Sequence, residues 1–117
     1  MKKVLIVDDN ELSIKLIKGY LSQLGCEVRV SDSPFGVLKI IKDFCPDVML
    51  LDLNMPGLGG RSVAGLIRKN YSGGNLKMIV FSAEPESVLQ QMVADGLVDD
   101  YFAKGSPFDN LRMKVLA

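Results

Sequence analysis

The sequence predicts an α/β fold in which a parallel five-stranded sheet carries helices on both faces. Short apolar runs of strand length alternate with stretches of helical periodicity along the whole chain. The runs at 3–7, 48–51 and 78–81 are almost continuously apolar, as is typical of parallel strands buried on both faces. Five successive β-α units, joined by right-handed crossovers, leave few possible arrangements of the sheet.

Length and composition favour one globular domain spanning residues 1–117. Hydrophobic residues make up 48% of the 117 positions and charged residues 24%, so the chain can bury a core. Lysine plus arginine and aspartate plus glutamate number 14 each, which gives a formal net charge of zero. No overall basic field exists to attract nucleic acid, and we expect no direct nucleic-acid binding by this domain.

The N-terminus resembles neither a secretion signal nor a membrane anchor. Four apolar residues precede Asp8 and Asp9, which is too short for the core of a signal peptide. No apolar run approaches the length that spans a bilayer. We therefore expect a cytoplasmic protein without membrane contact, in which Cys26 and Cys45 are free thiols.

In the first half of the chain, the strand at 3–7 is followed by a helix, a second strand and a second helix. Asn10 is placed to cap the first helix, and Gly25 ends it. The second strand is predicted at 26–30. The second helix is predicted to open at Ser33-Pro34 and to stop at Cys45-Pro46. The apolar positions of the two helices recur at helical spacing: Ile17, Tyr20, Leu21, Leu24, and then Val37, Ile40, Ile41, Phe44.

In the second half, strands at 48–51, 78–81 and 98–103 alternate with three further helices. A loop rich in turn residues covers 54–60, before the third helix. Pro85 suits the first turn of the fourth helix. For the last helix, which runs to about residue 116, the sequence predicts a cap, a first-turn proline and an acidic third residue: Ser106, Pro107 and Asp109.

Polar side chains follow four of the predicted strands, at the point where each strand ends. In open parallel sheets, ligands bind outside the carboxyl ends of the strands. Three carboxylates held together repel one another unless a cation joins them, and oxygen ligands without histidine or cysteine suit Mg²⁺. We expect these residues to converge on one edge of the sheet: Asp8, Asp9, Asp52, Ser82 and Lys104.

Such an edge suits phosphoryl transfer. A carboxylate can act as the nucleophile and form an aspartyl phosphate. Lys104 can pair with phosphate as a compact charge, and Ser82 can donate its hydroxyl to a phosphate oxygen. The chain has no histidine, which excludes Ser-His-Asp and Cys-His catalysis and histidine metal sites.

Four segments in register resemble the receiver domain of two-component response regulators, the family that includes the bacterial chemotaxis regulator. They are 4–10 (VLIVDDN), 48–57 (VMLLDLNMPG), 81–83 (FSA) and 99–104 (DDYFAK), and the resemblance covers essentially the whole chain. It implies a flavodoxin-like three-layer (βα)5 sandwich with strand order 2-1-3-4-5.

The resemblance also implies the chemistry of the site. Asp52 would accept a phosphoryl group from a histidine of a partner sensor histidine kinase or histidine phosphotransfer protein. Asp9, Asp52 and the backbone carbonyl of Asn54 would bind Mg²⁺ directly, and Asp8 would act mainly through water. Asn54 and Glu84 lie where the family tunes the rate of phosphate loss.

By the same resemblance, phosphorylation would switch a surface. Ser82 would move toward the phosphate, and Tyr101 would rotate into the space that Ser82 leaves. The face made by the fourth helix, the fifth strand and the fifth helix would then change shape for a downstream protein or an attached output domain. The sequence departs from the family pattern after Lys104, because Gly105 and Ser106 separate this lysine from Pro107.

Other interpretations remain open. Taken alone, Asp8 and Asp9 could cap a helix, and Tyr101 could be an ordinary strand residue. A pseudo-receiver would keep the fold without the switching, and only the altered segment after Lys104 supports it. A Mg²⁺-dependent phosphohydrolase commonly has a second acidic residue two positions after the nucleophile. That position is Asn54 here, and an asparagine cannot serve as a general acid or base. We therefore expect no turnover of external substrates.

Overall fold

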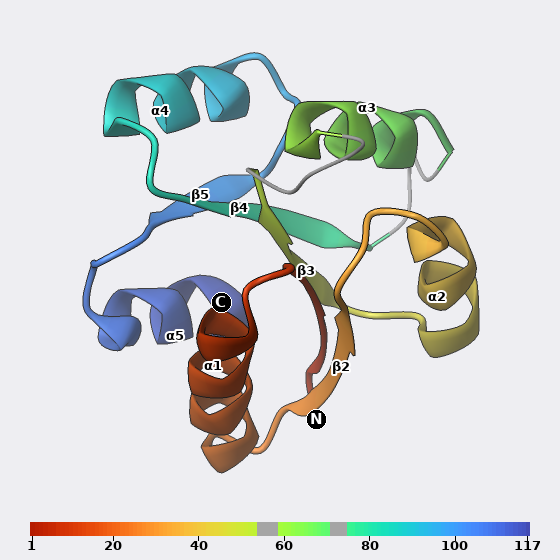
Figure 1. The fold of residues 1–117 in the computed structure, drawn as a ribbon, viewed down its shortest axis with the longest axis vertical. Helices are drawn as coiled ribbons and strands as arrows, with labels where there is room; N and C mark the ends of the chain where they lie inside the picture. The colour runs from red at the N-terminus through yellow and green to blue at the C-terminus, as the bar shows by residue number, and fades with distance from the viewer. Residues whose placement is uncertain (54–58, 71–74) are drawn as a thin grey trace.

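The computed structural model describes residues 1–53, 59–70 and 75–117. Strands and helices alternate, as predicted, and all neighbouring strands are parallel, in the order β2-β1-β3-β4-β5 (Figure 1). The elements are β1 (Lys3–Val7), α1 (Glu11–Gln23), β2 (Glu27–Ser31), α2 (Val37–Phe44), β3 (Val48–Asp52), α3 (Gly60–Asn70), β4 (Lys77–Ser82), α4 (Glu86–Ala94), β5 (Asp100–Ala103) and α5 (Phe108–Leu116).

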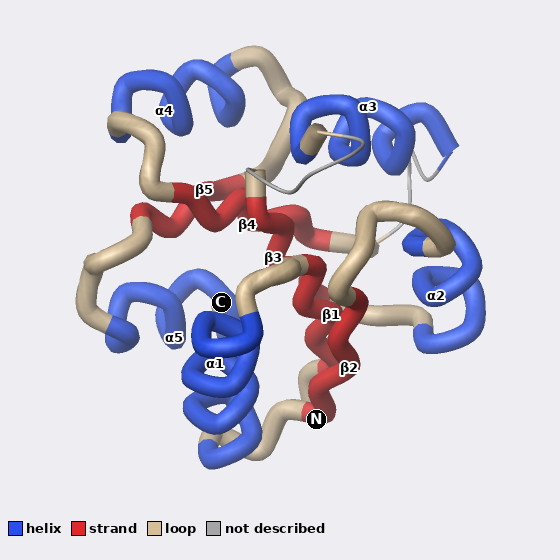
Figure 2. Tube along the Cα trace, in the orientation of Figure 1, coloured by secondary structure: helices blue, strands red, loops and turns tan. Residues whose placement is uncertain are grey.

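The sheet lies between two layers of helices. Helices α1 and α5 cover one face, and α2, α3 and α4 cover the other (Figure 2). Side chains alternate along each strand, so β1 sends Val4 and Ile6 to the α1–α5 side and Leu5 and Val7 to the opposite side. Each face thus has its own apolar core, which explains why the inner strands are continuously apolar.

Strand β3 is the centre of the sheet. It pairs with β1 on one side and β4 on the other, and all five of its residues are buried. Strand β5 lies at an edge, pairs with β4, and has only Phe102 fully buried. The sheet therefore runs from a buried central strand that ends in Asp52 to a half-exposed edge strand that contains Tyr101.

The start of α2 differs from the prediction. The helix begins at Val37, and Gly36 before it has a φ of 79°, in the left-handed region that favours glycine. The Oγ atom of Ser33 accepts a hydrogen bond of 3.1 Å from the N–H of Phe35. Ser33 therefore shapes a local turn instead of capping the helix.

The starts of α4 and α5 also differ by one residue. Pro85 and Pro107 are the capping residues, and neither helix has a side-chain cap. The prediction that Ser106 caps α5 is wrong, because its N–H donates to the carbonyl of Ala103 at 3.1 Å and the helix begins after Pro107. Asn10, in contrast, caps α1 as predicted, with its Oδ1 accepting the N–H of Ser13 at 2.9 Å.

Two strands are shifted from their predicted bounds. β2 covers 27–31 because the N–H of Cys26 still closes the end of α1, donating to the carbonyl of Leu21 at 3.1 Å. β5 begins at Asp100, after Asp99 has used both its N–H and its carboxylate to bond the backbone of Met78.

Both cysteines are free, Cys26 buried and Cys45 exposed. Across the described ranges, none of the helices has the length and apolar character needed to cross a membrane.

Candidate functional site

Three carboxylates meet where β1 and β3 end. Val7 pairs with Leu51 in the sheet, so the residues that follow them, Asp8 and Asp52, lie beside each other. One oxygen from each of Asp8, Asp9 and Asp52 falls within 4.8 Å of the other two. Parallel register thus brings together groups that are 43 or 44 positions apart in the chain.

The cluster is buried on one side and open on the other. Asp8 is 1% exposed and Asp52 3%, whereas Asp9 is exposed. Oδ1 of Asp8 accepts the N–H of Asn10 at 3.0 Å, but its buried Oδ2 has no hydrogen-bond partner among the described residues. Burial raises the pKa of Asp8 to about 6, and the neighbouring Asp52 carboxylate adds to the rise.

These features fit a hard divalent cation. The donors are all oxygens, one of them is a buried oxygen without a hydrogen-bond partner, and the exposed side at Asp9 leaves room for water. Mg²⁺ prefers a few carboxylates together with waters and phosphate oxygens. Asp8, Asp9 and Asp52 would hold it. Asn54, whose carbonyl is the other predicted ligand, lies outside the described residues.

Lys104 reaches the cluster from the end of β5. Its Nζ lies 3.7 Å from Oδ1 of Asp52, and its backbone N–H donates to the carbonyl of Ser82 at 2.8 Å. Gly105 follows with a φ of 91°, a conformation that side chains other than glycine rarely adopt. The chain therefore turns away after Lys104 through a glycine, while the lysine points toward Asp52.

Ser82 and Glu84 lie at the end of β4. Phe81 pairs with Asp52, which places Ser82 one residue beyond Asp52 on the neighbouring strand. Ser82 is fully buried, and its Oγ accepts the N–H of Glu84 at 3.0 Å. The carboxylate of Glu84 pairs with Arg61 of α3 at 3.3 Å.

Tyr101 stands apart from the carboxylates. It lies in the edge strand β5, partly exposed, with its hydroxyl 3.4 Å from Nε2 of Gln90 in α4. Nζ of Lys114 in α5 lies 4.8 Å from the centre of its ring. Tyr101 thus contacts the helix that precedes β5 in the chain and the helix that follows it.

The sequence profile of the family described as "Response regulator receiver domain" matches residues 4–116. The chain belongs to this family. The match includes the residues of the carboxylate cluster and Lys104, and it covers all the strands and helices apart from Lys3 at the start of β1.

Relatives place receiver domains of this kind in larger signalling proteins. The transcriptional regulatory protein YxdJ of Bacillus subtilis is 30% identical over 98% of this chain and 49% of its own length. The sensor histidine kinase GacS of Pseudomonas protegens is 30% identical over 87% of this chain and 12% of its own length. The chain thus spans about half of the matched regulator and a small part of the matched kinase.

Solved receiver structures share the fold. The response regulator TrrA of Thermotoga maritima, solved in complex with Mg²⁺-BeF, is 33% identical, with a TM-score of 0.86 over 99% of this chain and 97% of that one. The receiver domain of the Francisella response regulator 1452 is 27% identical, with a TM-score of 0.87 over 99% and 94%.

Gly60, at the end of the loop predicted over 54–60, lies against the end of the strand that carries Asp52. It is the first residue of α3, is buried, and its N–H donates to the carbonyl of Leu53 at 3.3 Å. A Cβ atom at this position would lie 2.6 Å from Cα of Leu53 and 2.9 Å from the carbonyl oxygen of Asp52. Only glycine allows α3 to start this close to the strand that carries Asp52.

The sequence also gives no indication of three residues that contact the predicted ones, namely Arg61, Gln90 and Lys114. Arg61 contacts Glu84, and both Gln90 and Lys114 contact Tyr101. All three are polar residues on helices, so no local sequence pattern distinguishes them from other polar helix positions.

Proposed function

We propose that this receiver domain is a phosphorylation switch in which Asp52 accepts a phosphoryl group from a histidine of a sensor kinase or a histidine phosphotransfer protein. The observation that carries the proposal is the buried Asp52 carboxylate, held in a cluster with Asp8 and Asp9 and 3.7 Å from the Lys104 ammonium. A nucleophile, a cation site and a phosphate partner therefore share one edge of the sheet.

The transfer is a direct displacement at phosphorus. A carboxylate oxygen of Asp52 attacks, the new O–P bond forms, and the P–N bond to the donor imidazole breaks; the leaving imidazole takes up a proton from solvent. Lys104 lies where it can pair with an oxygen of the arriving group. When bound, Mg²⁺ supplies positive charge against which the incoming phosphoryl oxygens are oriented. The Mg²⁺-BeF complex of TrrA supports this assignment.

The response passes from the site to the α4–β5–α5 face. Ser82 moves from the Glu84 N–H toward the phosphoryl group, and Tyr101 follows, which alters the face that partners bind. Asn54 and Glu84 set how long the phosphoryl group lasts. A relative that is a transcriptional regulator of twice the length supports an attached output domain or a separate downstream protein as the recipient, in the cytoplasm.

The domain acts on its own phosphoryl group and does not turn over external substrates. Intact-mass measurement with Mg²⁺ and a small acyl-phosphate or phosphoramidate donor tests this. We expect one added phosphoryl group in the wild type, none in Asp52→Ala, and an unchanged adduct in the control Asp43→Asn, which removes an exposed carboxylate on α2.

Other outcomes would favour other functions. Folded wild-type protein that takes up no phosphoryl group would contradict the proposal and favour a pseudo-receiver. Rapid release of phosphate from unrelated phosphate esters would favour a phosphohydrolase.

A further inference from the structure

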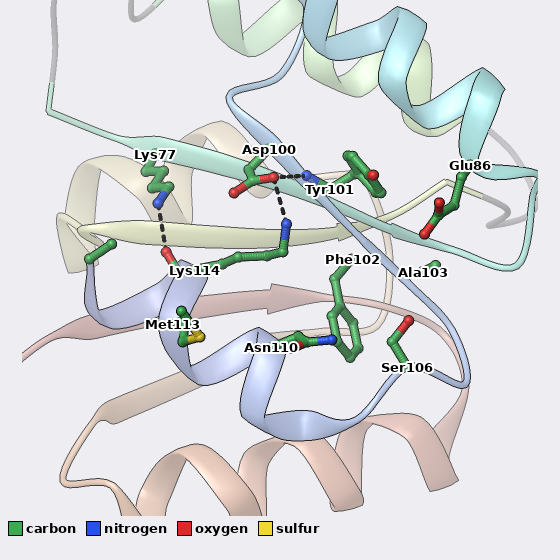
Figure 3. A pocket seen from close by; sticks show the side chains of 11 residues that line it. Lys77, Glu86, Asp100, Tyr101, Phe102, Ala103, Ser106, Asn110, Met113 and Lys114 are labelled. Carbon is green, nitrogen blue, oxygen red and sulfur yellow. Dashed lines mark hydrogen bonds and ion pairs between the residues drawn. The ribbon is translucent and has the colours of Figure 1, made fainter.

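Tyr101 is contacted at one face of its ring and at its hydroxyl, by residues of two different helices. Figure 3 shows it beside Asp100 on β5, with Lys114 on the neighbouring helix α5. Nζ of Lys114 lies 4.8 Å from the ring centre, and the hydroxyl lies 3.4 Å from Nε2 of Gln90. A cation at this distance from an aromatic face is attracted to it.

The Lys114 ammonium is itself fixed in place. It pairs with Oδ1 of Asp100 at 2.8 Å, and the same oxygen accepts the backbone N–H of Tyr101 at 2.8 Å (Figure 3). At the other end, Nζ of Lys77 in β4 donates to the carbonyl of Lys114 at 2.6 Å. Lys114 is therefore tied to β5 at Asp100, the residue before the tyrosine, and to the start of β4 at Lys77.

Tyr101 packs against the apolar core on the α2–α3–α4 side of the sheet, but another part of its surroundings is open. A surface pocket of about 450 Å³ runs along the ring, lined on this side by Glu86, Ala103 and Ser106 as well as by Lys114. Open space beside an aromatic ring allows more than one orientation. The polar contacts of Lys114 and Gln90 therefore add to this packing in favouring the orientation seen here.

We propose that Lys114 is a positioning residue that holds Tyr101 in the orientation seen here. It thereby sets the fraction of unphosphorylated molecules that are already in the switched state. This inference rests on the proposed function, in which Tyr101 reorients after phosphorylation. A ring that turns away loses the Lys114 contact, so the lysine favours the unswitched state. By linkage, it also weakens binding of any ligand that requires the switched state.

The test uses 3-fluorotyrosine-labelled protein and ¹⁹F NMR, with beryllofluoride and Mg²⁺ as the phosphoryl mimic. The chain has three tyrosines, and loss of a signal in Tyr101→Phe assigns the one of interest. In Lys114→Met, without beryllofluoride, we expect the Tyr101 signal to shift toward its beryllofluoride-bound position. We also expect the apparent affinity for beryllofluoride to rise by about two- to fivefold, the population change that a lost cation–π contact implies.

Two further variants separate this role from a general effect of charge or packing. Lys114→Arg keeps a cation at the ring and should resemble the wild type. Arg112→Met removes an equal charge from an exposed position of the same helix and should leave the Tyr101 signal unchanged.

A double variant ties the effect to the tyrosine. In a Tyr101→Ala background, Lys114→Met should leave the beryllofluoride affinity unchanged. The inference is wrong if the Tyr101 signal of Lys114→Met stays at the wild-type position, if Arg112→Met shifts it equally, or if the affinity gain persists without Tyr101. Failure of the wild type to bind beryllofluoride would instead contradict the proposed function, and the ¹⁹F comparison of unliganded proteins would still decide the role of Lys114.

Discussion

The buried carboxylate of Asp8 serves the cation site but lowers the stability of the fold. Its carboxyl group is 1% exposed, lies beside Asp52, and has one oxygen without a hydrogen-bond partner in the described part of the chain. Burial raises its pKa from 3.8 to about 6. The folded state then binds this proton more tightly than the unfolded state, so the free energy of unfolding falls as the pH rises from about 3.8 to about 6 and stays lower above that.

We therefore expect Asp8→Asn to stabilise the protein in Mg²⁺-free buffer at pH 7. The gain should be on the order of 1–3 kcal/mol, because the variant removes a buried charge that the empty cluster does not compensate. Urea unfolding at pH 7 and below pH 4 measures it, and the gain should vanish at the lower pH.

Asp9→Asn is the control for Asp8→Asn, since it removes an exposed carboxylate from the next position and should change stability less. Adding Mg²⁺ should stabilise the wild type more than Asp8→Asn. A gain that is equal at both pH values would contradict this account of Asp8.

Lys104 gives a second prediction at the scale of single residues. Lys104→Ala should still accept a phosphoryl group, because Asp52 is the proposed nucleophile, but the group should no longer switch Tyr101. Intact mass and the ¹⁹F signal of Tyr101 measure the two effects separately. Lys18→Ala, at an exposed position of α1, is the control. A Lys104→Ala variant whose Tyr101 signal moves fully on phosphorylation would contradict the role of this lysine.

Among the elements, the inner strands could be predicted and the helix starts could not. β1, β3 and β4 are buried on both faces, so their apolar runs identify them without reference to the rest of the fold. The starts of α2, α4 and α5 depend on whether a proline or serine lies inside the first turn or just before it. Sequence preferences for these positions overlap, and the turn at Gly36 was decisive for α2.

The start of α3 provides a prediction for a helix terminus. Alanine usually favours a helix over glycine by up to about 1 kcal/mol, so local propensity alone would make Gly60→Ala stabilising. The added Cβ would instead lie 2.6 Å from Cα of Leu53, which is backbone and cannot easily yield. We expect a loss of about 1–3 kcal/mol in the free energy of unfolding and slower phosphorylation of the displaced Asp52.

Gly59→Ala is the matched control for this prediction. A Cβ at position 59 would meet no atom within 4 Å, so this variant should change stability little. If Gly60→Ala is as stable as Gly59→Ala, the close approach of α3 to the end of β3 does not matter for the fold.

At the scale of the whole molecule, the topology explains which parts of the site were predictable. Parallel strands with their carboxyl ends at one edge bring Asp8, Asp9 and Asp52 together whatever the details of packing. The contacts of Arg61, Gln90 and Lys114 depend instead on side-chain conformations across neighbouring helices. Those conformations are set by tertiary packing and leave no periodic signal in the sequence.

The two apolar cores share one sheet, and we expect them to unfold together. Leu89→Ala in α4 and Leu111→Ala in α5 each truncate a fully buried side chain, on opposite faces. Each should lower the free energy of unfolding by about 2–5 kcal/mol within a single transition, measured by circular dichroism in urea.

Leu12→Ala, at a position that is 66% exposed on α1, is the control for these variants and should stay within about 0.5 kcal/mol of the wild type. Separate transitions for the two faces would show that the sheet does not couple them.

The position of β3 has a consequence for how a signal crosses the molecule. Its amides are enclosed by β1 and β4, so their hydrogens should exchange with solvent only when the whole domain opens. Those of β5, paired on one side and half-exposed, should exchange through local opening. The domain would receive its chemical input at the slowest-exchanging strand and report it at one of the fastest, with only β4 between them.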